Sequence, residues 1–191
     1  MSRALLRWRA PLLAVLVCVL SVARPASAAD ANSHIRVVEP QVAAMIETGS
    51  QESATFRAVT EQLESQPLLV FVRCLKPHEQ RASAAGLVFL ANTPNYRYVR
   101  VFLRCELPAS VTLPLLAHEF QHALEVARTD NVVDAVTLRA HYERAGYHSS
   151  SDDRAPSFET EAAIDVQRRV TIDLAHAQRA HASPIVGHAL E

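Results

Sequence analysis

The sequence predicts an α+β fold, because the spacing of apolar residues changes twice along the chain. From Val42 to Leu63, apolar side chains recur at three- and four-residue steps, as they do on one face of a helix. From Leu68 to Cys105, short apolar or alternating runs rich in valine and aromatic residues are typical of strands. Helical spacing returns at Leu113. We therefore expect a helix, a small antiparallel sheet and then three helices.

The first 28 residues have the layout of a secretory signal peptide. Arginines precede the apolar stretch Pro11 to Leu20, and Ala26-Ser27-Ala28 offers small residues for cleavage. An uncleaved membrane anchor is the alternative, but about ten continuously apolar residues fall short of the roughly twenty that cross a bilayer. We expect cleavage after Ala28, a periplasmic or extracellular location, and no stable insertion in the membrane.

Residues 29–191 are enough for a single domain with a hydrophobic core. The formal net charge is −1, and acidic and basic residues are interspersed. No field of one sign would attract nucleic acid or an anionic membrane, so neither partner is expected. Cys74 and Cys105 remain after cleavage, and an oxidising compartment favours a disulfide between them. Two buried thiols are the alternative. The oligomeric state is left open.

The first helix is expected over Val42 to Leu63, with a break at Gly49-Ser50. Three strands should follow, at Leu68 to Cys74, Leu87 to Leu90 and Tyr96 to Cys105. The turn residues Asn92 to Asn95 should join the last two strands as a hairpin. Alternation along the third strand predicts one core-facing set of side chains: Val99, Val101 and Leu103.

Three helices are expected in the C-terminal half. The first covers Leu113 to Arg128, and the second covers Asp134 to Ala145 and ends at Gly146. Serines and aspartates indicate a loop over Tyr147 to Pro156. A long last helix should then be capped by Ser157 and should end near Ala180.

The string His118-Glu119-Phe120-Gln121-His122 carries the clearest chemistry in the chain. Residues four apart on a helix lie one above the other, so both imidazoles can reach one ion, and zinc accepts such ligands. Glu119 would lie beside the metal, where it can take a proton from water whose pKa zinc lowers to about 7. Two surface histidines are the alternative interpretation, but the surrounding helix is strongly apolar. The histidines without ligand spacing are expected at the surface: His141, His176, His181 and His188.

A catalytic zinc site needs a third protein ligand. The pattern with a third histidine is absent, because Glu125 and Arg128 occupy the places of its glycine and histidine. At about 100° per helical residue, Glu159 lies near the centre of the apolar face of the last helix, and Glu161 lies on its solvent side. A buried carboxylate is costly unless it is paired or metal-bound, so Glu159 is the expected ligand. Glu161 remains the alternative ligand, and Glu159 has an alternative role as a first-turn acid that stabilises the helix.

Two segments, Leu116 to Glu125 and Phe158 to Ala163, resemble the ligand-bearing motifs of compact gluzincin-type zinc metallopeptidases. The first contains the HExxH motif and the second an ExxA motif. The same segments and the order of elements resemble a group of exported bacterial proteins of unassigned function. Many gluzincins have an aspartate four residues after the glutamate ligand, where this chain has Ala163. Asp165 lies four residues after Glu161, so the other register stays open.

The resemblance implies a single zincin-like domain over residues 29–191 that acts as a Zn²⁺-dependent peptidase. It also implies that the outer strand of the sheet binds an extended peptide by strand addition. Tyr96 to Arg104 is the expected edge, and an edge protected by its arginines is the alternative. Tyr147 and His148 are candidates for the oxyanion donor. A zinc-stabilised domain without catalysis, or a hydrolase of a non-peptide amide or cell-wall substrate, are the competing functions.

Overall fold

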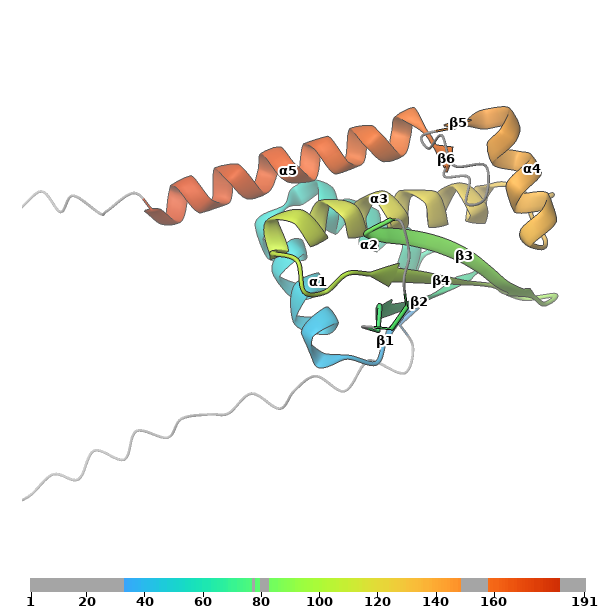
Figure 1. Ribbon diagram of the computed structural model, residues 1–191, viewed down its shortest axis with the longest axis horizontal. Coiled ribbons are helices and arrows are strands. Elements are labelled where there is room, and N and C mark those ends of the chain that lie inside the picture. The colour runs from blue at the N-terminus through green and yellow to red at the C-terminus, as the bar shows by residue number, and fades with distance from the viewer. Residues whose placement is uncertain (1–32, 77, 80–82, 149–157, 183–191) are drawn as a thin grey trace, which may run out of the picture.

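The computed structural model describes residues 33–76, 78–79, 83–148 and 158–182, and these residues form an α+β fold. The predicted leader, residues 1–28, lies outside the described residues. The helices are α1 (Pro40–Glu52), α2 (Ala54–Glu64), α3 (Ala109–Arg128), α4 (Ala135–Ala145) and α5 (Glu161–Ala182). The strands are β1 (Ile35–Val37), β2 (Leu68–Cys74), β3 (Ala85–Asn92), β4 (Arg97–Leu103), β5 (Tyr147–His148) and β6 (Phe158–Glu159). Figure 1 shows their arrangement.

The main sheet is mixed, so the prediction of an antiparallel sheet is wrong. Its strand order is β1-β2-β4-β3, in which β1 and β4 run parallel to β2 and only β3 runs antiparallel to β4. The first parallel pair is possible because α1 and α2 form the crossover between β1 and β2. Strand β1 was not predicted, because three residues are too few to give a pattern. The predicted hairpin between β3 and β4 is confirmed.

Strand β4 lies inside the sheet, which corrects the expectation that Tyr96 to Arg104 forms an edge. It pairs with β2 on one side and β3 on the other. Its core-facing residues are fully buried, as predicted: Val99, Val101 and Leu103. In the described part of the chain, β3 lies beyond β4 and forms that edge of the sheet. It is also longer than the predicted Leu87 to Leu90.

The expected first helix is divided into α1 and α2 at Ser53, and not at Gly49-Ser50. The Ser53 side chain accepts a hydrogen bond from the backbone N–H of Phe56 at 3.0 Å and thereby caps α2. Its hydroxyl also donates to the carboxylate of Asp173 in α5 at 2.7 Å. Gly49 continues α1, where an added Cβ would lie 2.7 Å from a methyl carbon of Leu113. The glycine therefore permits close packing of α1 against α3, and the serine begins the next helix.

Helix α3 lies between the sheet and α5, as Figure 1 shows. It begins at Ala109, four residues before the predicted start at Leu113. Because both sides of the helix are covered, its apolar residues are not confined to one narrow stripe. The fully buried ones are Leu113, Leu116, Ala117, Phe120, Ala123, Leu124 and Val126. Any polar residue on the covered surface of α3 is therefore held in an apolar setting.

Cys74 and Cys105 form a disulfide, which confirms the predicted pairing. Cys74 ends β2 and Cys105 follows β4, and these two strands are neighbours with Cys74 opposite Leu103. The bridge therefore closes one end of the central parallel pair.

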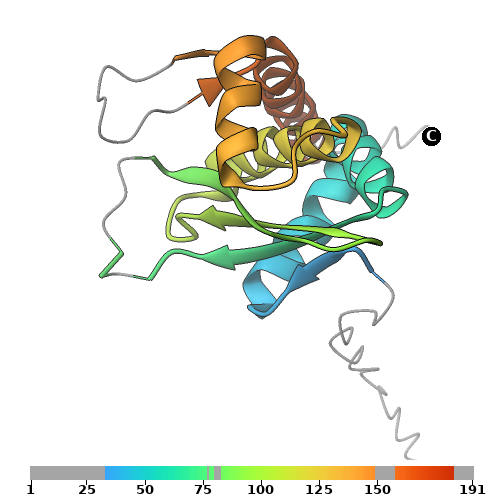
Figure 2. The same ribbon diagram turned by 90° about the vertical axis from the view of Figure 1, so that its right-hand side faces the viewer.

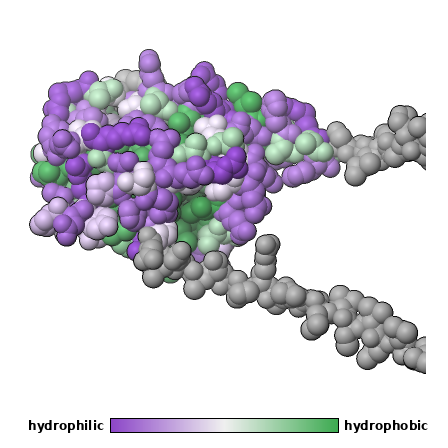
Figure 3. All heavy atoms as spheres, turned by 180° about the vertical axis from the view of Figure 1, so that it is seen from behind, coloured by the Kyte–Doolittle hydropathy of each residue, from purple (hydrophilic) through white to green (hydrophobic). Residues whose placement is uncertain are grey.

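The face shown in Figure 3 is largely hydrophilic, and its hydrophobic areas are small and separated. The large apolar residues with substantial exposure are spread along the chain: Val38, Leu90, Val111, Val133, Val136, Ile164 and Ile172. Among the described residues, no helix has the length and apolar character needed to cross a membrane.

Candidate metal centre

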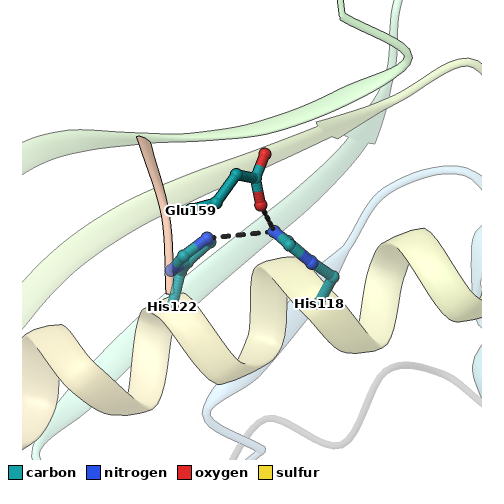
Figure 4. Close-up of side chains that lie close together, drawn as sticks. All are labelled: His118, His122 and Glu159. Carbon is teal, nitrogen blue, oxygen red and sulfur yellow. Dashed lines mark hydrogen bonds and ion pairs between the residues drawn. The ribbon is translucent and has the colours of Figure 1, made fainter. Parts of the chain in front are cut away.

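Helix α3 brings His118 and His122 together on one of its faces. Their Nε2 atoms are 3.0 Å apart, and the two residues are only 6% and 5% exposed. Figure 4 shows both imidazoles directed to the same point above the helix. The four-residue spacing of the motif produces this arrangement locally, as expected from the rise of one helical turn.

Glu159 joins the two histidines from β6. Its Oε2 atom lies 2.8 Å from Nε2 of His118, and the candidate ligand atoms of the three residues all lie within 4.8 Å of one another (Figure 4). Glu161, the alternative ligand, is exposed at the first position of α5 and does not belong to this group. Of the two glutamates, the structure therefore brings Glu159 to the histidines.

Contrary to the prediction, Glu159 does not lie on the apolar face of the last helix, because α5 begins only at Glu161. The side chain of Thr160 accepts a hydrogen bond from the backbone N–H of Ala163 at 3.1 Å and so acts as the cap. Ser157, the predicted cap, lies outside the described residues. Glu159 precedes the helix and reaches the histidines from a strand.

A short β-ladder and a close backbone contact hold Glu159 in place. Tyr147 of β5 pairs with Glu159 of β6. Gly146 ends α4, as predicted, with its N–H bonded to the carbonyl of Tyr142 at 2.8 Å. An added Cβ on Gly146 would lie 2.7 Å from the carbonyl oxygen of Glu159. Glycine is needed here for space and not for an unusual backbone angle, since its φ is −108°.

The three side chains have the right types and spacing to hold a metal ion. In a tetrahedral zinc site with ligand bonds near 2.0–2.2 Å, neighbouring ligand atoms are about 3.3 Å apart. Two of the three separations, 2.8 Å and 3.0 Å, are close to that value, and the third is no more than 4.8 Å, so side-chain rotations would accommodate an ion. Two imidazoles and a carboxylate also form a donor set that zinc accepts in catalytic sites.

Two carboxylates give the group a negative environment that suits a cation. Burial alone lowers the pKa of His118, but its hydrogen bond with Glu159 and the charges of Glu119 and Glu159 raise it above the usual value. The pKa of Glu119 is raised by burial, against the opposing effect of the two histidines. Glu119 is 7% exposed and lies next to His118 in α3. A carboxylate with a raised pKa binds a proton more strongly than an ordinary carboxylate does.

Glu125 and Tyr142 support His122, and neither was predicted from the sequence to have a role at the site. Oε2 of Glu125 lies 2.9 Å from Nδ1 of His122, and Oε1 accepts a hydrogen bond from Thr160 at 2.7 Å. The Tyr142 hydroxyl donates to the carbonyl of His122 at 3.3 Å, and its ring packs edge-on against the imidazole. Burial opposes ionisation of Glu125, but the hydrogen bond and charge of His122 lower its pKa overall. The feature of the sequence that could have identified Glu125 is its three-residue spacing from His122, which places both residues on the same helical face.

The candidate oxyanion donors and the histidines expected at the surface agree only in part with the predictions. Tyr147 and His148, predicted in a loop, form β5 beside the strand of Glu159, but their side chains lie outside what the structure describes. Their role as oxyanion donors stays a prediction. His176 and His181 are exposed, as expected, and His188 lies outside the described residues. His141 is only partly exposed, because its ring packs against Tyr142.

Comparison with known proteins identifies no family for this chain. No protein-family model, curated protein or solved structure matches the chain. The function is therefore inferred from the site itself.

Proposed function

We propose that the mature chain is an exported zinc-dependent hydrolase that cleaves peptide bonds. The observation that carries the proposal is the convergence of His118 and His122 from α3 with Glu159 from β6, with Glu119 buried beside them. In this proposal the three converging residues bind zinc, and Glu119 remains free of the metal to act as a base. The resemblance of the two sequence motifs to those of gluzincin-type peptidases supports this assignment of roles.

Glu119 would perform the proton transfers of the reaction. Zinc bound by the three ligands would act as a Lewis acid and would lower the pKa of a water in its open position to about 7. Glu119 would accept the proton of the attacking water, because it is buried beside the histidines and is not itself one of the candidate ligands. The resulting carboxylic acid could then return the proton to the nitrogen of the leaving amine, so that Glu119 ends the cycle ionised. The apolar surroundings of α3 strengthen these electrostatic interactions.

The edge of β3 is the surface along which we propose that an extended peptide binds. It replaces Tyr96 to Arg104 in this role, because β4 already has a partner on both sides. Among the described residues, β3 pairs with β4 alone and packs against α3, the helix that bears the two histidines. Figure 2 shows β3 along the side of the sheet below α3 and α4. A peptide added to this edge would run close to the metal-binding side chains.

Removal of zinc tests the proposed function. The protein comprising residues 29–191 is expected to contain about one zinc equivalent and to cleave unstructured peptides, with new N-termini identified by mass spectrometry. Treatment with a chelator should abolish cleavage, and added zinc should restore it, since the ligands survive the treatment. Cleavage that continues at full rate in zinc-free protein would contradict the proposal.

A further inference from the structure

The Glu125 carboxylate lies between His122, a candidate ligand, and Thr160, the residue that follows the candidate ligand Glu159. One oxygen contacts Nδ1 of His122 at 2.9 Å, and the other accepts the hydroxyl hydrogen of Thr160 at 2.7 Å. Only 16% of the Glu125 side chain is exposed, so water competes weakly for these contacts. Glu125 is itself outside the group of candidate ligands. Its carboxylate is therefore placed to orient ligands and not to bind the ion.

The contact with His122 selects the tautomer that a metal needs. When Nδ1 carries the hydrogen and donates it to Glu125, the lone pair of the imidazole is on Nε2. That atom faces His118, 3.0 Å from its Nε2, where the ligand atoms converge. A carboxylate in this position also increases the basicity of the ligating nitrogen.

The contact with Thr160 positions the third ligand through the backbone. Thr160 directly follows Glu159, is 8% exposed, and also accepts the N–H of Ala163 at the start of α5. Its hydroxyl thus joins the end of β6, the beginning of α5 and the carboxylate on α3. Movement of Thr160 away from Glu125 would carry the backbone of Glu159 away from the histidines.

We infer that Glu125 is a positioning residue that preassembles the metal centre, with one oxygen fixing the imidazole of His122 and the other holding the Thr160 segment that presents Glu159. The inference rests on the proposed function, because it concerns the same ion. Partners behind metal ligands typically change metal affinity by about 10- to 100-fold when they are removed. An effect of that size is expected from loss of the Glu125 carboxylate.

Zinc competition titrations and the visible spectrum of the cobalt-substituted protein test the inference without measuring activity. Glu125→Ala should weaken zinc binding about 10- to 100-fold and should change the cobalt spectrum, because His122 loses its fixed orientation. Glu125→Gln can still accept the hydrogen of His122 but lacks the charge, so its affinity should lie between those of Glu125→Ala and the wild type. If Glu125→Ala does not fold without metal, Glu125→Gln provides the comparison.

Thr160 offers a matched pair of variants. Thr160→Val keeps the shape of the side chain and removes the hydroxyl, so it should weaken zinc binding by about tenfold. Thr160→Ser keeps the hydroxyl and should bind zinc within about twofold of the wild type. Adding Thr160→Val to Glu125→Ala should cause little further loss of affinity, since residues of one hydrogen-bonded unit are not additive.

Loss of a helix cap could by itself lower stability, so Ser53→Ala is the control. Ser53 caps α2 as Thr160 caps α5, and its partners are in α2 and α5 and not among the metal-binding residues. This variant should unfold more easily but should keep the zinc affinity and cobalt spectrum of the wild type. Wild-type affinity and spectrum in Glu125→Ala, or in both Glu125→Gln and Thr160→Val, would overturn the positioning role. In that case the proposed function could still be correct, since the wild type could bind zinc and depend on Glu119 for turnover. A wild type that binds no zinc would contradict the proposed function as well.

Discussion

Glu119→Gln is expected to reduce peptide cleavage about 10²- to 10⁴-fold, while the protein keeps about one equivalent of zinc. Glutamine has nearly the shape of glutamate, but its amide cannot accept a proton from the attacking water. The metal should remain, because Glu119 is outside the group formed by His118, His122 and Glu159. Steady-state kcat and zinc content, both measured on the same purified sample, check this result.

Glu143→Gln is a suitable control for the removal of a carboxylate. Glu143 lies on α4 and pairs with Arg139 at an exposed position, so its loss should leave turnover unchanged. Undiminished cleavage by Glu119→Gln would show that Glu119 is not the base. A zinc-binding wild-type protein that cleaves no peptide would instead favour the zinc-stabilised domain without catalysis.

Glu159→Gln should weaken zinc binding by at least about 100-fold, and Glu161→Gln should leave it unchanged. Loss of a direct ligand costs more than loss of a residue behind a ligand, for which about 10- to 100-fold is typical. Glu159 lies 2.8 Å from Nε2 of His118, whereas Glu161 is exposed at the start of α5. Competition with a chromophoric chelator measures both affinities under the same conditions.

This pair of variants also decides between the two sequence registers. Both substitutions remove one negative charge within the same short segment, so a general effect of charge should change both affinities equally. A larger loss in Glu161→Gln, or equal losses in the two variants, would contradict Glu159 as the third ligand.

Features that depend on neighbouring residues in the sequence could be predicted. The relation of His118 to His122 is set within one turn of α3, so the four-residue spacing was sufficient. The hairpin between β3 and β4 and the end of α4 at Gly146 likewise depend on local turn and capping residues. The cysteine pair followed from composition and from the expected compartment.

Features that depend on distant contacts could not be predicted in the same way. The position of β4 between β2 and β3 is a matter of strand order, which alternation along one strand does not encode. Glu159 is held by two-residue strands that are too short to give a pattern. The role of Glu125 requires Thr160, 35 residues further along the chain, to be next to it.

The most direct test of a three-ligand metal centre is an anomalous difference map, recorded at the zinc absorption edge, from zinc-loaded crystals of residues 29–191. We expect one strong peak at about 2.0–2.2 Å from Nε2 of His118, Nε2 of His122 and a carboxylate oxygen of Glu159. A zinc peak elsewhere, or one bound by the histidines while Glu159 points away, would contradict the metal centre proposed for this protein.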